Sequence, residues 1–294
     1  MSNIINQFKE LIKHQGIKGS INTILRRLFN PRAKSSKILK QFLAGKYGLE
    51  IGGPSNIFKY IGILPIYPIA YRIDNCNFSY STIWEGSIEE GYNFHYSKKK
   101  PPGFQHVCDS VDLGKIKSNN YDFILSCHTL EHIANPLKAL YEWKRVLKDD
   151  GFFVLILPHK DATFDHLRPI TKLSHLIEDY DNNIKEDDLT HLLETLKLHE
   201  LNMTPEYTDY DEFKSIMENN KKHRRLHHHV FDTQLVIKIM NYIGFKLYAI
   251  EPILHNNIIA IGRKTESGIV PDNTVFLNNL TVYKRESPFK SDRN

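Results

Sequence analysis

The stretch YDFILSCHTLEHIANPLKALYEWKRVLKDDGFFVLILP, residues 121–158, decides the fold. It begins with an apolar run, Tyr121–Cys127, and ends with a second one, Phe152–Pro158. A helical pattern of roughly 12 residues separates the two runs, and Gly151 follows its end. Strands that are apolar on both faces and joined by a helix indicate a parallel sheet with right-handed crossovers. The stretch therefore predicts an α/β fold, a doubly wound, mostly parallel, Rossmann-like sheet with helices on both faces.

The alternation of helix and strand extends on both sides of this stretch. The strands expected before it are Tyr47–Ile51, Ile69–Asp74 and Phe104–Asp109. After residue 230, a helix and two further strands are expected to close the sheet. Residues 161–230 break the rhythm with amphipathic helical patterns rich in His, Asp and Glu. We interpret residues 41–264 as one domain that carries 161–230 as a helical insertion after the fifth strand.

The two ends of the chain differ from this domain. Residues 1–40 hold nine Lys and Arg residues and one Glu, whereas the whole chain has a net charge of +5. They predict a basic arm of amphipathic helices, and three roles are open to it: packing on its own domain or on a second subunit, peripheral contact with an anionic membrane, or nucleic-acid binding. We expect no nucleic-acid partner, and we leave membrane contact and a homodimer open. Residues 265–294 are predicted to form a loosely packed tail.

Composition predicts a cytoplasmic protein. No stretch approaches the ~18 consecutive apolar residues of a membrane span. The first residues lack the apolar region of a secretory signal. The chain has three cysteines, Cys76, Cys108 and Cys127, and no CxxC pair, so neither a disulfide framework nor a cysteine zinc site is expected.

A glycine turn follows the first expected strand. Gly52 and Gly53 carry no Cβ, so the backbone can approach a ligand closely at the carboxyl end of the strand. Glu50 beside them would repel a pyrophosphate and suits a cationic ligand. Asp74 and Asp109, expected at the ends of the next two strands, suit the two hydroxyls of a ribose and the amine of an adenine. The three carboxylates together describe a nucleoside that carries a positive charge and no phosphate.

This set, together with residues 121–158, resembles the class I S-adenosylmethionine-dependent methyltransferases, in the branch that acts on small molecules and in glycan biosynthesis. The resemblance covers roughly residues 40–160 and 231–264, and the family implies S-adenosyl-L-methionine as cofactor. The turn Glu-Ile-Gly-Gly-Pro-Ser lacks the third glycine of the family pattern, so its local shape is expected to differ. The residues that the resemblance assigns to the cofactor are Glu50, Gly52, Gly53, Asp74, Asp109, Ser126, Cys127 and His128.

Polar residues after the fourth and fifth strands are the candidates for chemistry. His has a pKa near neutrality and can accept the proton of an alcohol, which favours O-methylation mildly over N-methylation. The predicted catalytic residues are His159, His128 and Asp161. The predicted substrate contacts are His159, Asp165, His166, Arg168, His227 and His229. His132 is expected to cap and pack the turn that follows it.

The acceptor predicted for the insertion is a polar small molecule or a glycan, and the whole chain resembles methyltransferases of surface-polysaccharide biosynthesis. Two histidines with Asp165 or Asp161 could hold a divalent metal, but we expect none. Two other functions remain open. A scaffold protein would bind the cofactor without turnover, and a nicotinamide-dependent oxidoreductase would need a turn that accepts phosphate, which Glu50 opposes.

Overall fold

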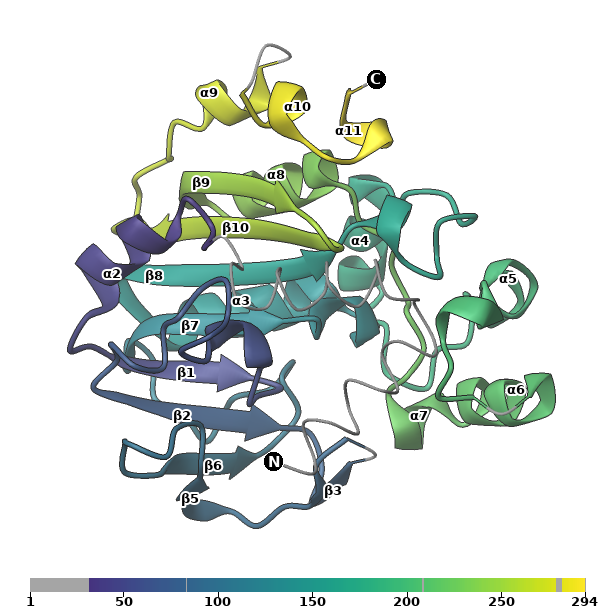
Figure 1. Ribbon diagram of the computed structural model, residues 1–294, viewed down its shortest axis with the longest axis horizontal. Coiled ribbons are helices and arrows are strands. Elements are labelled where there is room, and N and C mark those ends of the chain that lie inside the picture. Colours follow the sequence, from purple (N-terminus) through teal and green to yellow (C-terminus); the bar gives the residue numbers. More distant parts are fainter. Residues whose placement is uncertain (1–31, 83, 208, 279–281, 294) are drawn as a thin grey trace, which may run out of the picture.

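The computed structural model describes residues 32–82, 84–207, 209–278 and 282–293. One sheet of eight strands organises the domain, in the order β5-β6-β2-β1-β7-β8-β10-β9 (Figure 1). Neighbours among the five central strands run parallel, and the outer strands pair antiparallel. The parallel strands are β1 (Tyr47–Ile51), β2 (Arg72–Asn77), β6 (Gly103–Val107), β7 (Tyr121–Cys127) and β8 (Leu147–Pro158). The others are β5 (Gly91–Phe94), β9 (Phe245–Ile253) and β10 (Asn257–Lys264).

Two hydrophobic cores lie on opposite faces of this sheet. Successive residues of β7 alternate between them: Ile124 belongs to one core, and Phe123 and Leu125 to the other. The first core also contains buried residues of α3 (Pro136–Val146) and α8 (Thr233–Tyr242), and the second those of α2 (Ser36–Leu43). Because side chains alternate across a strand, a central strand buried on both faces needs a helix layer on each side. The prediction of a doubly wound, Rossmann-like fold is confirmed.

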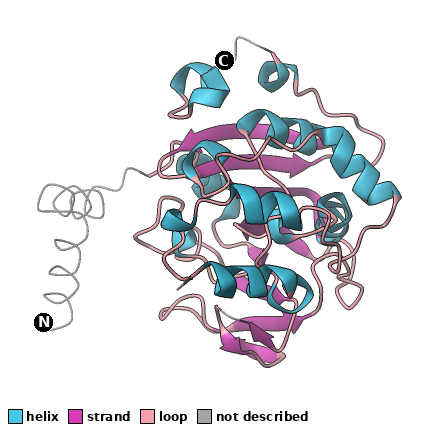
Figure 2. Cartoon of the chain, turned by 90° about the vertical axis from the view of Figure 1, so that its right-hand side faces the viewer, coloured by secondary structure: helices cyan, strands magenta, loops and turns pink. Residues whose placement is uncertain are grey.

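The helices of the insertion lie beyond the carboxyl ends of the parallel strands. They are α4 (Leu173–Asp181), α5 (Leu192–Leu198), α6 (Tyr210–Glu218) and α7 (Asn220–His223). In Figure 1 the arrows of β1, β2, β7 and β8 point towards α5, α6 and α7, and Figure 2 views the molecule from that side. The insertion has a small core of its own, made of Phe213, Met217 and Leu226. It therefore depends on contacts with the sheet domain for its position.

The remaining elements are short. A two-stranded hairpin is formed by β3 (Ser81–Thr82) and β4 (Gly86–Ser87). Single turns of 3₁₀-helix cover Asn56–Phe58, Leu130–His132, Lys160–Ala162 and Leu201–Met203. Near the end of the chain lie α9 (Thr274–Leu277), α10 (Val282–Glu286) and α11 (Lys290–Arg293). None of the helices in the described part of the chain has the length and apolar character needed to cross a membrane.

The expectation of a loosely packed C-terminal tail is wrong for residues 282–293, whereas most residues of 265–278 are exposed or half-buried. Tyr283, Phe289 and Asp292 are buried. Phe289 stacks on His159 with ring centroids 3.9 Å apart, and Asp292 accepts hydrogen bonds from Thr233 and Ser287. Apolar residues earlier in the tail, among them Ile269, Val270 and Val275, are exposed, whereas Phe289 and Asp292 have partners on the sheet domain.

The expected basic arm falls largely outside the described residues. The part that is described, from residue 32 onward, packs on its own domain. Leu39 and Leu43 of α2 are buried, and Glu251 of β9 accepts hydrogen bonds from the backbone N–H groups of Lys34 and Ser35. Membrane contact and a second subunit stay predictions.

Candidate functional site

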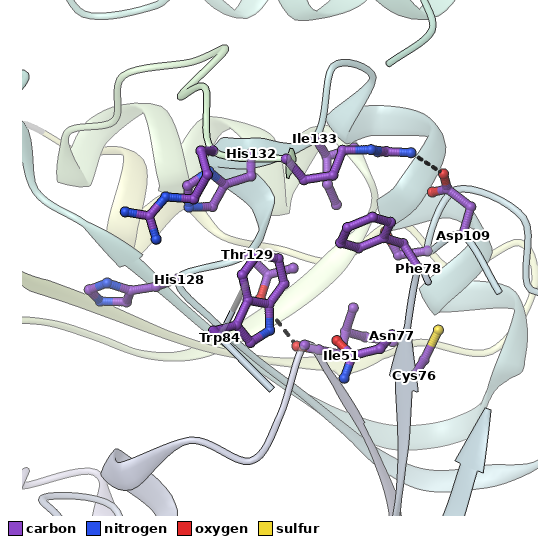
Figure 3. A pocket seen from close by; sticks show the side chains of 14 residues that line it. Ile51, Cys76, Asn77, Phe78, Trp84, Asp109, His128, Thr129, His132 and Ile133 are labelled. Carbon is purple, nitrogen blue, oxygen red and sulfur yellow. Dashed lines mark hydrogen bonds and ion pairs between the residues drawn. The ribbon is translucent and has the colours of Figure 1, made fainter. Parts of the chain in front are cut away.

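A cavity of about 180 Å³ lies at the carboxyl ends of four parallel strands, and we call it the strand-end cavity (Figure 3). Gly52 follows β1, Asn77 ends β2, Asp109 follows β6 and His128 follows β7, and all four line it. Arg224 of the insertion also lines it. Open parallel sheets bind ligands at this place because strand order reverses there. β1 lies between β2 and β7, so the cavity occupies the point of reversal.

The glycine turn has a different architecture from the expected one. Glu50 is fully buried and lies behind the turn, where its carboxylate accepts hydrogen bonds from the Ser55 N–H (3.0 Å), the Ser55 hydroxyl (2.7 Å) and the Tyr67 hydroxyl (2.6 Å). A Cβ on Gly53 would fall 2.3 Å from the Glu50 carboxyl carbon, so glycine makes room for this carboxylate. Gly52 has φ +78° and faces Thr129. Glu50 therefore shapes the turn and does not line the cavity, contrary to the expected contact with a cationic ligand.

Burial has a further effect on Glu50. It raises the pKa of this carboxyl to about 7, although the bonds from Ser55 and Tyr67 act in the opposite direction. Within the described part of the chain, no cationic side chain is among its hydrogen-bond partners. The charged form of Glu50 is consequently costly near neutral pH.

The prediction that β2 ends at Asp74 is wrong, because the strand runs three residues further, to Asn77. Asp74 pairs with Leu49 inside the sheet and is buried. Its carboxylate accepts hydrogen bonds from the hydroxyls of Tyr47 and Tyr121 and from the N–H of Phe104. Asp74 thus ties β2 to its neighbours and does not line the strand-end cavity. Glu50, Asp74 and Asp109 do not converge on one hollow.

Asn77 takes the place at the end of β2 that Asp74 was expected to hold. Asn77 is buried, lines the cavity and ends the strand. Asn75, two residues earlier, bonds Gly53 in both directions, since its Oδ1 accepts from the Gly53 N–H at 2.9 Å and its Nδ2 donates to the Gly53 carbonyl at 3.2 Å. Sequence reasoning missed both residues. The available signal was two amide side chains, Asn75 and Asn77, on either side of Cys76 in a strand with no exposed face.

Asp109 lines the cavity as predicted, but an arginine from the insertion already contacts it. Arg224 Nη2 lies 2.7 Å from Asp109 Oδ2, and Arg224 Nη1 lies 2.7 Å from Glu186 Oε2. The guanidinium also lies over the ring of Phe78, 5.0 Å from its centroid. Arg224 reaches this position from the end of α7, with a left-handed backbone (φ 51°). It joins the insertion to the sheet across the cavity, a contact between residues far apart in the sequence that no local pattern indicates.

A second cavity of about 160 Å³ adjoins the first, and we call it the insertion cavity. His132 and Arg225 line both cavities, so the two are neighbours. Most of its other lining residues are polar, and they include Tyr207 and His227. His132 was expected to be structural, yet its Nδ1 is buried without a hydrogen-bond partner among the described residues, and its ring centroid lies 4.5 Å from that of His227.

His227 is held by a carboxylate. Its Nδ1 lies 2.5 Å from Asp165 Oδ2, and Asp165 Oδ1 accepts from Arg168 Nη1 at 3.0 Å. Burial opposes ionisation of Asp165, but the neighbouring His227 and Arg168 prevail and lower its pKa to about 2. The ionised carboxylate fixes the proton of a neutral His227 on Nδ1 and leaves the lone pair on Nε2. The structure thus brings together three of the predicted substrate contacts, Asp165, Arg168 and His227.

Arg168 cannot serve as the expected anion contact. It is almost completely buried, and its guanidinium donates to Asp165, to Glu194 (2.7 Å) and to the His227 carbonyl (2.9 Å). Its role is to hold the segment that carries His227.

The expectation that His159 stands beside the crevice is wrong. Its ring is fully buried: Nδ1 accepts from the Asp161 N–H at 3.1 Å, Nε2 lies 3.2 Å from Asp292 Oδ1, and Phe289 covers one face. Asp161 is exposed and accepts a hydrogen bond from the N–H of Ser291. Neither residue lines the strand-end cavity or the insertion cavity.

The other predicted residues are distributed as follows. His128 lines the strand-end cavity, and its Nε2 lies 2.9 Å from Asn257 Oδ1. Ser126 and Cys127 belong to β7 and do not line that cavity, and Ser126 is fully buried. Nδ1 of His166 lies within hydrogen-bond distance, 3.1 Å, of the Thr163 carbonyl oxygen. His229 belongs to a separate group with His175 and His191.

Residues 88–155 match a family model described as "Methyltransferase domain". The matched residues begin just before β5, end within β8, and include Asp109, His128 and His132 of the strand-end cavity. An uncharacterized protein from Methanocaldococcus jannaschii is 36% identical over 56 residues, which are 19% of this chain. The match covers 24% of that relative's length.

Solved structures of methyltransferases are also similar to this chain. One is an S-adenosylmethionine-dependent methyltransferase from Aquifex aeolicus, with 13% identity, coverage of 87% of this chain and 97% of the other, and a TM-score of 0.40. Another is the Burkholderia thailandensis 1,6-didemethyltoxoflavin-N1-methyltransferase, solved with bound 1,6-didemethyltoxoflavin and S-adenosylhomocysteine. It has 10% identity, coverage of 90% of both chains and a TM-score of 0.44.

Proposed function

We propose that this protein is an S-adenosylmethionine-dependent methyltransferase that acts on a polar small molecule or sugar. One observation carries the proposal: the segment that matches the methyltransferase domain model supplies Asp109, His128 and His132 to a cavity at the reversal point of the sheet. Such a cavity is the default ligand site of an open parallel sheet. The proposed methyltransferase activity is thus supported because the segment that matches the family model coincides with a cavity that was located from geometry alone.

The residues of the strand-end cavity fit a nucleoside cofactor. Gly52 keeps the end of β1 free of a side chain, Asn77 offers an amide to ribose hydroxyls, and Asp109 offers a carboxylate to an exocyclic amine. The present volume is below the roughly 300–1,000 Å³ of a typical ligand pocket. Arg224 lies across it on Asp109, so we expect this side chain to move when the cofactor enters.

A nicotinamide-dependent activity receives less support. Dinucleotide sites place the pyrophosphate at the N-terminus of the helix that follows the first strand. After β1 this chain has a single 3₁₀ turn, Asn56–Phe58, and the buried carboxylate of Glu50 lies behind the glycines. The turn therefore offers no long helix dipole to a pyrophosphate.

We further propose that the insertion cavity takes the acceptor. It shares His132 and Arg225 with the strand-end cavity, so two ligands would meet side by side. Hydroxyl, imidazole and guanidinium groups dominate its lining, which suits an acceptor with several hydroxyls. A role in surface glycan biosynthesis is the specific form of this proposal, and the polar lining is its support.

S-Adenosylmethionine supplies an activated methyl group. Transfer to a hydroxyl releases a proton, and we assign its acceptance to Nε2 of His227, whose other nitrogen is held by Asp165. His227 replaces His159 as the proposed base, because it lines a cavity and His159 does not. An oxygen acceptor is favoured by this arrangement, since an uncharged amine would not need a base before attack.

The experiment measures S-adenosylhomocysteine formation from S-adenosylmethionine in the presence of pools of nucleotide sugars, oligosaccharides and small polar metabolites. We expect acceptor-dependent turnover that falls about 10²–10⁴-fold in His227→Gln. His166→Gln, a change in the same insertion at a residue that lines neither cavity, is the matched control and should retain turnover.

The outcomes separate the alternatives. Cofactor binding without turnover in any pool would support the scaffold protein instead. Failure to bind S-adenosylhomocysteine would remove the proposal altogether.

A further inference from the structure

Three histidines and one aspartate converge where the insertion meets the sheet domain. We call them the histidine cluster, and its members are His175, Asp179, His191 and His229. His175 and Asp179 are one turn apart on α4, so their side chains share a face of that helix. His191 directly precedes α5, and His229 lies between α7 and α8. Side chains from three separate segments therefore meet at one place.

The separations within the histidine cluster match those of a metal's ligands. His175 Nε2 lies 2.9 Å from His191 Nε2 and 3.5 Å from Asp179 Oδ2. His229 Nε2 lies 3.6 Å from the same oxygen. Each imidazole has a ring nitrogen within 4.8 Å of those of the other two. Bonds of about 2.0–2.1 Å to a tetrahedral zinc ion place neighbouring ligand atoms roughly 3.3 Å apart. The measured separations lie on either side of this value.

The cluster also leaves a buried acceptor unsatisfied. Asp179 Oδ2 is buried and has no hydrogen-bond partner among the described residues, although two imidazoles lie near it. His229 is 1% exposed, and its Nδ1 has no partner among those residues either. Buried polar atoms without partners are rare in folded proteins because each costs free energy. A cation between the four side chains would satisfy Asp179 Oδ2, and it would bind Nε2 of His229 in place of that atom's 3.3 Å contact with the Ala134 carbonyl.

The donor set specifies the class of metal. Mg²⁺ and Ca²⁺ prefer oxygen ligands, whereas three imidazole nitrogens with one carboxylate are typical of Zn²⁺. Four protein ligands close a tetrahedral shell and leave no position for substrate, which is the pattern of a structural site. We propose that the histidine cluster binds one zinc ion, which fastens the insertion to the sheet domain.

A zinc ion at this place would stabilise the position of the insertion on the sheet domain. The core of the insertion is small, with Phe213, Met217 and Leu226 as its buried members. α4 is anchored to the sheet domain through the buried Leu176, and Asn135 at the start of α3 donates to the Asp179 carbonyl at 2.9 Å. A metal bound by α4, His191 and His229 would cross-link α5 and the segment before α8 to this anchor. Metal binding of this kind contributes directly to folding.

A second group competes for the same role. Glu131, His132 and His227 also place ligand atoms within 4.8 Å of one another. That group has three members, and Asp165 contacts His227 Nδ1, which leaves Nε2 of that ring for any other ligand. We favour the histidine cluster because a fourth ligand, Asp179, completes it, and the second group becomes an outcome of the test.

The test is metal analysis of the full-length protein after dialysis against a metal-free buffer, followed by titration with Zn²⁺ alone. We expect one zinc per chain in the wild type and loss of this zinc in His191→Gln and in Asp179→Asn. His166→Gln, a histidine of the insertion outside the cluster, should keep it. A chelator should lower the melting temperature of the wild type and leave that of His191→Gln unchanged. Circular dichroism checks that the variants fold. If Asp179→Asn does not fold, the result for His191→Gln decides the test, because the ring of His191 is partly exposed and its replacement should be tolerated.

Two results would overturn the proposal. One is wild-type protein that takes up no stoichiometric zinc. The other is a zinc ion that survives His191→Gln and is lost in His132→Gln, which would assign the metal to the second group. Because the readouts are metal content and melting temperature, the result does not depend on whether the protein transfers methyl groups.

Discussion

Arg224 of the insertion and Asp109 of the sheet domain form an ion pair, 2.7 Å between Nη2 and Oδ2, across the strand-end cavity. Asp109 is the carboxylate that we assign to the amine of a nucleoside. The same oxygen cannot serve the guanidinium and that amine equally well. We therefore expect the pair to couple the position of the insertion to the occupancy of the cavity.

This competition predicts opposite effects of two substitutions. Asp109→Ala should weaken S-adenosylhomocysteine binding by about 1.5–3 kcal/mol, the scale of hydrogen bonds to a charged group. Arg224→Ala should leave the affinity unchanged or improve it, because it frees Asp109. Isothermal titration calorimetry measures both. Equal losses in the two variants would mean that the ion pair builds the site rather than competes with the ligand.

Asp74 and Asn77 lie on the same strand, and we expect their substitution to have contrasting effects on stability and on ligand binding. Asp74→Ala should lower the free energy of unfolding by roughly 2–5 kcal/mol, because it leaves buried donors of Tyr121 and Phe104 without an acceptor. Asn77→Ala should weaken S-adenosylhomocysteine by about 0.5–1.5 kcal/mol with a smaller effect on folding. Urea unfolding and calorimetry separate the two effects. If Asp74→Ala lost as much affinity as Asn77→Ala while still folded, Asp74 would reach the ligand after all.

The pKa of Glu50 predicts a pH dependence of stability. Burial raises this pKa from 4.5 to about 7, so between these values the native state holds a proton that the unfolded state has released. The contribution of Glu50 to stability therefore falls as pH rises through this interval, by about 1.4 kcal/mol per pH unit, and is constant above it. Glu50→Gln removes the effect.

Its measurement is the difference in melting temperature between Glu50→Gln and wild type at about pH 5 and about pH 8. The difference should shift in favour of the variant at the higher pH. Glu218→Gln on α6, whose carboxylate is 47% exposed, is the control and should show little shift. A pH-independent difference for Glu50→Gln would contradict the raised pKa.

The C-terminal segment predicts a purely structural role for His159. Phe289→Ala should destabilise the protein by about 3–5 kcal/mol, the scale of a buried phenylalanine, whereas Val275→Ala at an exposed site should stay within about 0.5 kcal/mol. Neither change, nor His159→Gln, should alter turnover of the folded enzyme. Loss of turnover in folded His159→Gln, with stability intact, would restore His159 as a catalytic candidate.

The fold class could be predicted from the sequence because apolar runs and helical periodicity are local patterns. β7 runs over Tyr121–Cys127 as predicted, since an apolar run bounded by polar residues needs no distant partner to be recognised. β2 was misplaced by three residues because Asn75 and Asn77 are buried polar residues. Asn75 is satisfied by Gly53 and Gln105, and those partners lie elsewhere in the chain.

The candidate site was predictable only where strand ends define it. Asp109 and His128 follow β6 and β7, and both line the strand-end cavity. Arg224 comes from an insertion whose path no periodicity reveals. His159 follows β8 as expected, but Asp292 and Phe289 cover it from the far end of the chain. The four-residue spacing of His175 and Asp179 is enough to predict that they share one face of a helix. Their proximity to His191 and His229 can be seen only in the three-dimensional structure.

The central claim is that the strand-end cavity binds a nucleoside sulfonium cofactor and not a dinucleotide. Calorimetric titration of the wild-type protein with S-adenosylhomocysteine, and separately with NAD, tests it most directly. We predict saturable binding of S-adenosylhomocysteine that Asp109→Ala weakens, and no measurable binding of NAD. Binding of NAD in its place, or S-adenosylhomocysteine binding that is indifferent to both Asp109 and Asn77, would contradict the assignment of this cavity.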